Sequence, residues 1–352
     1  ALAAAIGDAK ARPLLAFAHG GLAEHHAVGL SKDERKAVHD WCETRGLESA
    51  SHDDAGEARR VLVVTRLATT PTPAEAERDP PETFDGCLRA FVHGMLRVDR
   101  SMALEWDEIL KGFDLTPPDG VHFIGSVPGF RKGPFSEAFG HRAIRRALDR
   151  EGLSVARAEF ANSSLGSLNH KGFLRGFATS LFGTGDLDRL KIVWPSQAVA
   201  VRSSRRLMLH AMTDDKGTAQ MKGPDDSVWR KDHFPKKCFA HYHAPSDRQT
   251  LHHTKMLALV GEDEQLVAVV GGSHNCSGAA WGVGEDNMSV IMSYEAGVLV
   301  TCGAGRRARV LDALPWRCPA PPYDLDGGVE PWSGSRLLAQ LRPKGAALDA
   351  AS

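Results

Sequence analysis

The alternation of apolar and polar positions along the chain predicts strands and helices that follow one another. Apolar runs at 60–65, 121–126 and 266–270 are typical of short buried strands. Apolar residues at helical spacing predict helices at 31–45 and 138–151. Further strands are expected at 13–18 and 192–195, and further helices at 86–96 and 101–111. This order of elements favours a mixed α/β sandwich.

Two polar stretches interrupt that alternation. Residues 69–85 are rich in Pro, Thr, Glu and Asp, which is typical of a loop or linker, and residues 213–246 are polar and irregular. We expect two lobes, an amino-terminal lobe over 1–118 and a carboxy-terminal lobe over 119–352. The sequence shows no short-period repeat, which excludes a solenoid.

Charge and cysteine content narrow the classes of protein. The 352 residues carry 43 Lys and Arg against 44 Asp and Glu, a net charge of −1. Any attraction to phosphates must therefore come from a local basic patch. The six cysteines form no CxxC pair, so we expect reduced thiols and neither a disulfide scaffold nor a zinc site. No apolar run approaches the roughly 20 residues that span a bilayer, so we expect no membrane partner.

The richest candidate chemistry lies at 251–257, in Leu-His-His-Thr-Lys-Met-Leu. Alternate residues of a strand share a face, so His253 and Lys255 are expected to point the same way. The strand at 266–270 leads into a Gly-Gly-Ser-His-Asn turn. A hairpin-like return would bring Asn275 of that turn beside His253 and Lys255.

These three side chains suit phosphodiester chemistry. Lysine is a compact cation for the non-bridging oxygens, and the asparagine amide adds a hydrogen-bond donor. An imidazole can attack phosphorus or carry the proton of the leaving group near neutral pH. Fixed cations can stabilise the transferring group, so we expect no metal and no cofactor.

Chance is the competing explanation, because a single His-x-Lys pattern is common in proteins without such a site. The asparagine turn at the right distance from it makes the combination specific. The neighbouring His252 and His274 fit surface or packing roles better than catalysis.

Several segments resemble the tyrosyl-DNA phosphodiesterase family of the phospholipase D superfamily. Ser-His-Asn-Cys-Ser-Gly-Ala-Ala-Trp-Gly at 273–282 is similar to the signature of the family's second half. Phe-Ala-Asn-Ser-Ser-Leu-Gly-Ser-Leu at 160–168 is similar to its serine-rich, DNA-contacting loop. Shorter segments that match in order lie at 123–129, 293–299, 322–325 and 331–332. The resemblance runs from about residue 96 to residue 332.

The resemblance implies a fold, a reaction and partners. The fold would be a phospholipase D-like, two-lobed mixed α/β sandwich. The reaction would be hydrolysis of the 3′-phosphodiester between DNA and tyrosine or another 3′ blocking group, in DNA repair. The partners would be single-stranded or nicked DNA 3′ ends and DNA–protein adducts, and the location would be the nucleus.

The resemblance also implies roles for four residues of the candidate site. His253 would be the general acid and base. Lys255 and Asn275 would grip the phosphate. Glu295 would orient a catalytic imidazole, and a buried carboxylate paired with a histidine would hold its tautomer and favour the cationic form.

Contacts with the DNA strand would come from serines and tryptophans. Ser164, Ser167 and Ser277 would donate hydrogen bonds to DNA phosphates, which position the strand without reading its sequence. A capping turn before a helix is the alternative role for each serine. Trp332 or Trp281 would be available to stack on bases, although Trp281 is more often a core residue in such a position.

The chain departs from the family in its amino-terminal half. The family carries two His-x-Lys motifs, one in each half, and the first supplies the nucleophile. No second such motif followed by an asparagine occurs in this sequence. His19, His25, His26 and His52 are candidate imidazoles for that role, but none has a lysine two positions later. We therefore expect the first lobe to be incomplete or divergent.

Several explanations of this gap stay open. The nucleophile segment is missing because the chain is a divergent or incomplete gene product, or a second chain completes the site in a homodimer, as in superfamily members with one motif per subunit. Alternatively, the protein is a catalytically impaired DNA-end-binding protein. A related phosphodiesterase acting on RNA or lipid is a further alternative, and the lack of an amphipathic basic helix argues against lipid.

Overall fold

The computed structural model describes residues 2–11, 14, 24–27, 30–43, 47–53, 60–66, 79–95, 100–166, 168, 172–202, 224, 229, 234–243, 253–284 and 288–333. The strand expected at 13–18 lies outside these residues except for Leu14, which is helical. Ser167 and His19 also lie outside them. Among the helices of these ranges, none is long and apolar enough to cross a membrane.

The described part of a small amino-terminal unit includes the helices α1 and α3 and a three-stranded antiparallel sheet of order β1-β3-β2. Its elements are α1 (Leu2–Ile6), β1 (Glu24–Ala27), α3 (Lys32–Glu43), β2 (Leu47–Asp53) and β3 (Arg60–Arg66). The start of α3 is fixed by a capping box, in which Ser31 Oγ accepts from Glu34 N at 3.2 Å and Glu34 Oε2 accepts from Ser31 N at 2.7 Å. The helix and strand expected at 31–45 and 60–65 are therefore confirmed.

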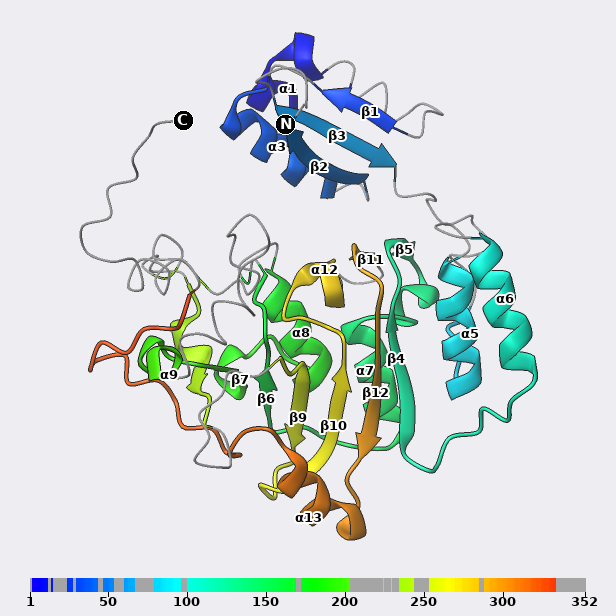
Figure 1. The fold of residues 1–352 in the computed structure, drawn as a ribbon, viewed down its shortest axis with the longest axis vertical. Coiled ribbons are helices and arrows are strands. Elements are labelled where there is room, and N and C mark those ends of the chain that lie inside the picture. The colour runs from blue at the N-terminus through cyan, green and yellow to red at the C-terminus, as the bar shows by residue number, and fades with distance from the viewer. Residues whose placement is uncertain are drawn as a thin grey trace, which may run out of the picture.

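A seven-stranded mixed sheet of order β4-β12-β10-β9-β6-β7-β8 forms the centre of the larger unit (Figure 1). The strands are β4 (Val121–Ser126), β6 (Arg157–Ala161), β7 (Leu190–Trp194), β8 (Phe239–His241), β9 (Met256–Val260), β10 (Leu266–Gly272) and β12 (Glu295–Thr301). The pairs β6–β7 and β7–β8 are parallel, and the other pairs are antiparallel. The expected mixed α/β class is confirmed. The amino-terminal unit has the smaller, three-stranded sheet.

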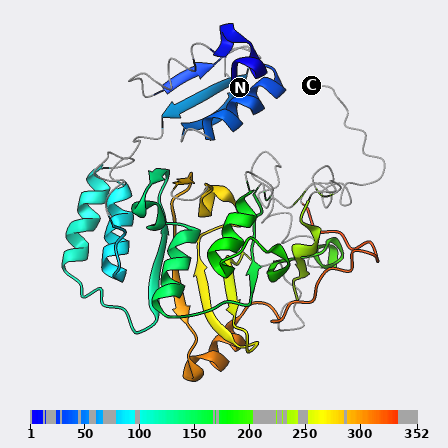
Figure 2. The same ribbon diagram turned by 180° about the vertical axis from the view of Figure 1, so that it is seen from behind.

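Residues of β9 show how the sheet is buried on both faces. Leu257 and Leu259 belong to the cluster on the face covered by α7 (His141–Arg150) and α8 (Phe173–Phe182), which lie in front of the sheet in Figure 2. Ala258 and Val260 belong to a second cluster on the opposite face, which includes Leu314 and Trp316 after α13 (Ala304–Ala313). The uninterrupted apolar sequence of β9 follows from this double burial.

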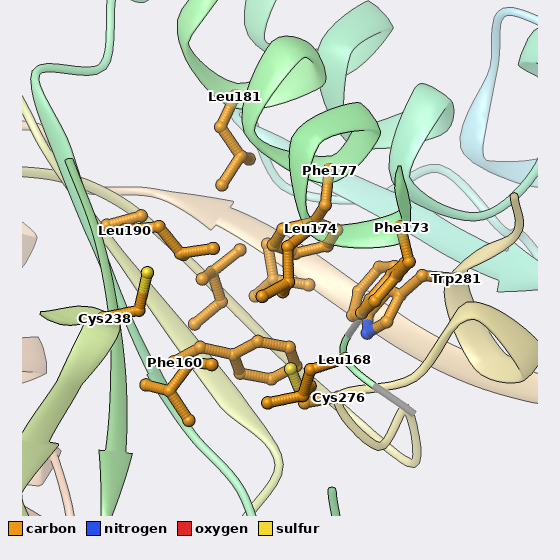
Figure 3. Packing of buried hydrophobic residues seen from close by; sticks show 14 of the residues in the cluster. Phe160, Leu168, Phe173, Leu174, Phe177, Leu181, Leu190, Cys238, Cys276 and Trp281 are labelled. Atoms are coloured by element: carbon orange, nitrogen blue, oxygen red, sulfur yellow. The ribbon is translucent and has the colours of Figure 1, made fainter. Parts of the chain in front are cut away.

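Aromatic rings fill the core between the sheet and α8 (Figure 3). Phe160 of β6 stacks on Phe177 of α8 with ring centroids 5.7 Å apart. Phe177 in turn meets Trp281 of α12 (Gly278–Trp281) edge-on at 5.4 Å. Trp281 is thus a core residue, and it holds α12 beside the end of the sheet.

The helices α5 (Phe84–Gly94) and α6 (Arg100–Lys111) pack with the larger unit. The rings of Phe84 and Phe91 lie edge-on to Phe123 of β4, with centroids 5.8 and 5.6 Å apart. Tyr294 Oη donates to the carbonyl of Gly94 at 2.9 Å. Division of the chain after residue 118 stays a prediction, and these contacts attach α5 to the carboxy-terminal sheet.

Short elements complete the larger unit. A two-stranded ribbon pairs β5 (Gly129–Lys132) with β11 (Met288–Ile291). The remaining elements are η2 (Pro134–Glu137), η4 (Leu187–Arg189), α9 (Gln197–Arg202) and η5 (Lys236–Cys238).

Candidate active site

The candidate residues gather at one end of the seven-stranded sheet, the upper end in Figure 1. Lys255 immediately precedes β9, Asn275 follows the end of β10, and Glu295 begins β12. Ser164 follows the end of β6. Because β9 and β12 run antiparallel to β10, the starts of β9 and β12 and the end of β10 lie at the same end of the sheet.

Backbone hydrogen bonds between neighbouring strands fix the positions of these residues relative to one another. Gly272 N donates to the carbonyl of Lys255 at 3.2 Å, and Ser273 N donates to the carbonyl of Ala296 at 2.9 Å. Position 272 requires glycine, because a Cβ there would lie 2.4 Å from the carbonyl oxygen of Ala296. The expected hairpin-like return is therefore present, and it brings the Asn275 turn beside the His253–Lys255 segment.

The His253 and Lys255 side chains lie against one another, although both residues precede β9 and so are not in the strand that was expected to hold them. Lys255 Nζ is 3.3 Å from His253 Nε2, and it donates to Ser163 Oγ at 2.6 Å. His253 is exposed, Lys255 is half-buried and Ser163 is buried. Partial burial and then the Lys255 charge lower the pKa of His253, so the folded protein favours a neutral imidazole near pH 7.

The charges of Lys255 and Glu295 act on each other across the strand ends. Partial burial lowers the pKa of Lys255, and the Glu295 carboxylate opposes this change. Partial burial raises the pKa of Glu295, while a hydrogen bond from Ser273 and the Lys255 charge oppose it. Both side chains therefore sit in a partly desolvated environment in which each favours the charged form of the other.

The expected pairing of Glu295 with a catalytic imidazole stays a prediction for the unidentified histidine of the first half, and His253 is not its partner in the structure. His253 and Glu295 are both described, and they share no hydrogen bond. His253 Nε2 faces the Lys255 ammonium instead. The ammonium favours the neutral form of this imidazole.

A buried histidine supports the turn that carries Asn275. His274 is 2% exposed, stacks on Trp281 at 4.1 Å between centroids, and its Nε2 lies 3.1 Å from Ser126 Oγ. Burial lowers its pKa to about 3, so it is neutral. His274 therefore has the packing role that the sequence favoured.

Asn275 retains hydrogen-bonding capacity for a ligand. Its Oδ1 is buried and has no hydrogen-bond partner among the described residues. An unsatisfied buried polar atom costs about 1–3 kcal/mol, which a bound donor would relieve. The unpaired atom is an acceptor, so it would take a hydrogen bond from a donor group of a ligand or from water.

The serine-rich loop lies directly against the Asn275 turn. Asn162 Oδ1 accepts from Ser164 N at 3.1 Å, and Gly166 N donates to the carbonyl of Cys276 at 3.0 Å. Ser164 is half-buried at this junction. Ser277 Oγ accepts from Ala280 N at 3.2 Å, so it caps α12, which was its alternative role, and its own hydroxyl proton stays available for donation.

The expectation that Trp332 stacks on DNA bases is wrong. Trp332 is 0% exposed and stacks on Trp194 of β7 with centroids 5.7 Å apart. Trp194 Nε1 also donates to the carbonyl of Trp332 at 2.9 Å. A fully buried ring cannot meet a base, so Trp332 belongs to the core.

Sequence reasoning missed two serines that contact the charged residues. Ser163 accepts from Lys255, and Ser273 hydrogen-bonds with Glu295. Ser163 directly precedes Ser164 in the serine-rich loop, but the choice between them requires the register of β6 against β9. That pairing places Ala161 opposite Met256, so the residues that follow β6 lie beside those that precede β9.

The candidate nucleophiles of the amino-terminal half lie in or near the small sheet. His25 and His26 lie in β1 opposite Val64 and Val63 of β3, and His52 lies in β2. None of the contacts that the structure describes places them at the end of the large sheet. The site as described therefore combines one accessible imidazole, one ammonium, one amide and one carboxylate.

Comparisons with known proteins identify the family and a similar fold. The family model of tyrosyl-DNA phosphodiesterase matches residues 50–315. The crystal structure of the yeast tyrosyl-DNA phosphodiesterase is similar, with a TM-score of 0.52 and 17% sequence identity over 78% of this chain and 69% of that chain. No curated protein sequence matches the chain significantly.

The family match is broader than the resemblance seen in the sequence, because it begins within β2 and includes β3 and His52. At 17% identity the yeast structure shows a shared fold, which is phospholipase D-like. The family match covers the site, both helices before β4 and part of the small sheet. The chain belongs to the tyrosyl-DNA phosphodiesterase family, whose members are phosphodiesterases of DNA repair.

Proposed function

We propose that the protein hydrolyses the 3′-phosphodiester between DNA and tyrosine or another 3′ blocking group. The observation that carries this proposal is the contact of Lys255 Nζ with both His253 Nε2 and Ser163 Oγ, beside the Asn275 turn. Lysine and the asparagine amide bind the non-bridging oxygens there, while the imidazole handles the proton of the leaving oxygen.

His253 supplies and recovers one proton in this scheme. Protonated His253 gives its proton to the tyrosyl oxygen as a nucleophile bonds to phosphorus and the phosphorus–oxygen bond to tyrosine breaks. Neutral His253 then takes a proton from the water that attacks phosphorus. Since the pKa of His253 is lowered in the free protein, the imidazole must take up a proton before the first step.

A second imidazole as nucleophile would form a phosphohistidine between these two steps. Of the four candidates, His52 lies within the residues that match the family model, whereas His19, His25 and His26 precede them. His52 is therefore the first position to replace in a search for the nucleophile. A His52→Ala variant that retains full single-turnover release would exclude it.

A homodimer offers another source of the nucleophile. We propose it as the arrangement to test if no histidine of the same chain is required. Mixing His253→Ala protein with a variant that lacks the nucleophile would restore release only if a site draws on two chains. Release that is not restored by mixing would place both groups in one chain.

Single-turnover release of tyrosine from a 3′-phosphotyrosyl oligonucleotide tests the proposed reaction. Wild type should release tyrosine, and His253→Ala should lose release or stall as a covalent adduct. The matched control is His243→Ala, which removes an exposed histidine after β8. No release by wild type at enzyme excess, with DNA binding intact, would reject the hydrolytic function.

That last outcome would instead support a DNA-end-binding protein without turnover. The departure from the two-motif pattern favours this second candidate. Binding through phosphates should weaken steeply as the salt concentration rises. For either function we propose the nucleus as the location, which imaging of the tagged full chain would test.

A further inference from the structure

Ser163 is buried directly beneath the ammonium of Lys255. It is 1% exposed, and its Oγ accepts from Lys255 Nζ at 2.6 Å. Hydrogen bonds from a charged donor are short and about twice as strong as neutral ones. Among the contacts of the site this one is the shortest, and it joins residues 92 positions apart in the sequence.

The ammonium of Lys255 has three protons and, among the residues that the structure describes, two hydrogen-bonding partners. One proton is directed to Ser163 Oγ and another lies toward His253 Nε2, which is 3.3 Å away. The third proton remains for a non-bridging phosphate oxygen. The direction of that third proton depends on where the other two are held.

Ser163 and His253 lie at different distances from the ammonium. The bond with Ser163 is shorter by 0.7 Å, as 3.3 Å minus 2.6 Å, so Ser163 is the stronger anchor. The contact with His253 involves the ring nitrogen that must exchange a proton during the reaction. An anchor that restrains the ammonium therefore also limits how closely its charge approaches the reacting imidazole.

We propose that Ser163 is a positioning residue that holds Lys255 Nζ at the phosphate and keeps it from closing on His253 Nε2. The role deepens the proposed function and rests on it for its effect on rate. Its effect on the His253–Lys255 pair exists in the free protein and does not depend on turnover.

Two predictions distinguish positioning from general stabilisation. Replacement of Ser163 by alanine should lower kcat on the order of 10- to 100-fold while KM stays nearly unchanged, because the lysine remains present but is misplaced. The ammonium, left with His253 as its partner, should move the midpoint of the His253 titration to lower pH.

The experiment compares Ser163→Ala with Ser163→Thr, which keeps a hydroxyl, and with Ser180→Ala as the matched control. Ser180 is also buried, and its hydroxyl makes a 2.6 Å hydrogen bond, with His141 Nδ1 in the helical layer. Single-turnover rates and NMR titration of isotope-labelled histidines are measured on each full-length variant. Rate loss and a lower His253 midpoint in Ser163→Ala, recovered by threonine and absent in the control, are the expected result.

An unchanged or raised His253 midpoint in Ser163→Ala would overturn the proposal, as would a rate loss that Ser180→Ala shares. If Ser163→Thr unfolds at a lower temperature, the comparison of Ser163→Ala with wild type and Ser180→Ala still tests the proposal. If wild type itself releases no tyrosine, the proposed function fails, while the titration of His253 still tests Ser163 separately.

Discussion

Gly166 lies so close to Ser277 that a Cβ at position 166 would be 2.4 Å from the Ser277 Cβ. This approach joins the serine-rich loop to the turn that carries Asn275. Gly166→Ala should separate the two segments and reduce both DNA binding and single-turnover release. Melting temperature and oligonucleotide affinity, measured on the same samples, check this expectation.

Gly305→Ala is the control for that substitution. A Cβ at position 305, within α13, would meet no atom within 4 Å. Alanine is favoured over glycine inside a helix by about 0.5–1 kcal/mol, so this variant should be slightly more stable and fully active. Equal behaviour of the two variants would show that the close approach at Gly166 does not matter for the site.

Lys255→Gln should remove the cation while keeping a polar side chain. Loss of one preorganised donor to a developing charge costs on the order of 10²–10³ in rate, so release should fall by about that factor. The salt dependence of DNA binding should also weaken by about one phosphate contact. Lys237→Gln, at an exposed lysine after β7, should change neither quantity.

Acid should destabilise the fold through two buried histidines. The pKa of His141 and of His274 falls from 6.5 to about 3, in both cases chiefly because of burial. The imidazoles bind protons in the unfolded chain more readily than in the folded protein. Their contribution to the free energy of unfolding is therefore fully present above pH 6.5 and is lost progressively as the pH falls toward 3. Each contributes a slope of up to about 1.4 kcal/mol per pH unit.

Denaturant titrations between pH 7 and pH 4 test this slope. His274→Gln should flatten it, whereas His243→Gln, at an exposed position, should leave it unchanged. A slope that is identical in His274→Gln and wild type would show that the buried imidazole does not exclude protons.

Trp332→Ala should destabilise the protein by about 3–5 kcal/mol, because it empties a fully buried position beside Trp194. Trp332→Phe should cost less. Oligonucleotide affinity of the folded fraction should stay at the wild-type value in Trp332→Phe. A selective loss of DNA affinity at unchanged melting temperature would instead restore the base-stacking role.

The local sequence pattern predicted correctly those elements whose structure depends on residues close together in the chain. The strand at 121–126 matches β4 in both bounds, and the hairpin of β9 and β10 brings His253, Lys255 and the Asn275 turn together. Both results depend on apolar runs and on a turn only a few residues long. Within the polar stretch at 213–246, by contrast, β8 was missed because three residues give too short a signal.

Long-range packing accounts for what the sequence did not reveal. Ser163 meets Lys255 only because β6 and β9 are neighbours in the sheet, across 92 residues. Trp332 is buried by Trp194, which lies 138 residues earlier in the chain. Neither strand order nor burial of this kind follows from spacing along one sequence.

The bond between Tyr294 and Gly94 has a consequence for the evolution of the site. Tyr294 directly precedes Glu295, and a side chain at position 94 would lie 2.4 Å from a methyl of Val127. A change at Gly94 would therefore displace the end of α5 and, through Tyr294, the carboxylate of the site. Positions 94, 127 and 294 are expected to vary together among related sequences, even though none of the three is a candidate to touch DNA.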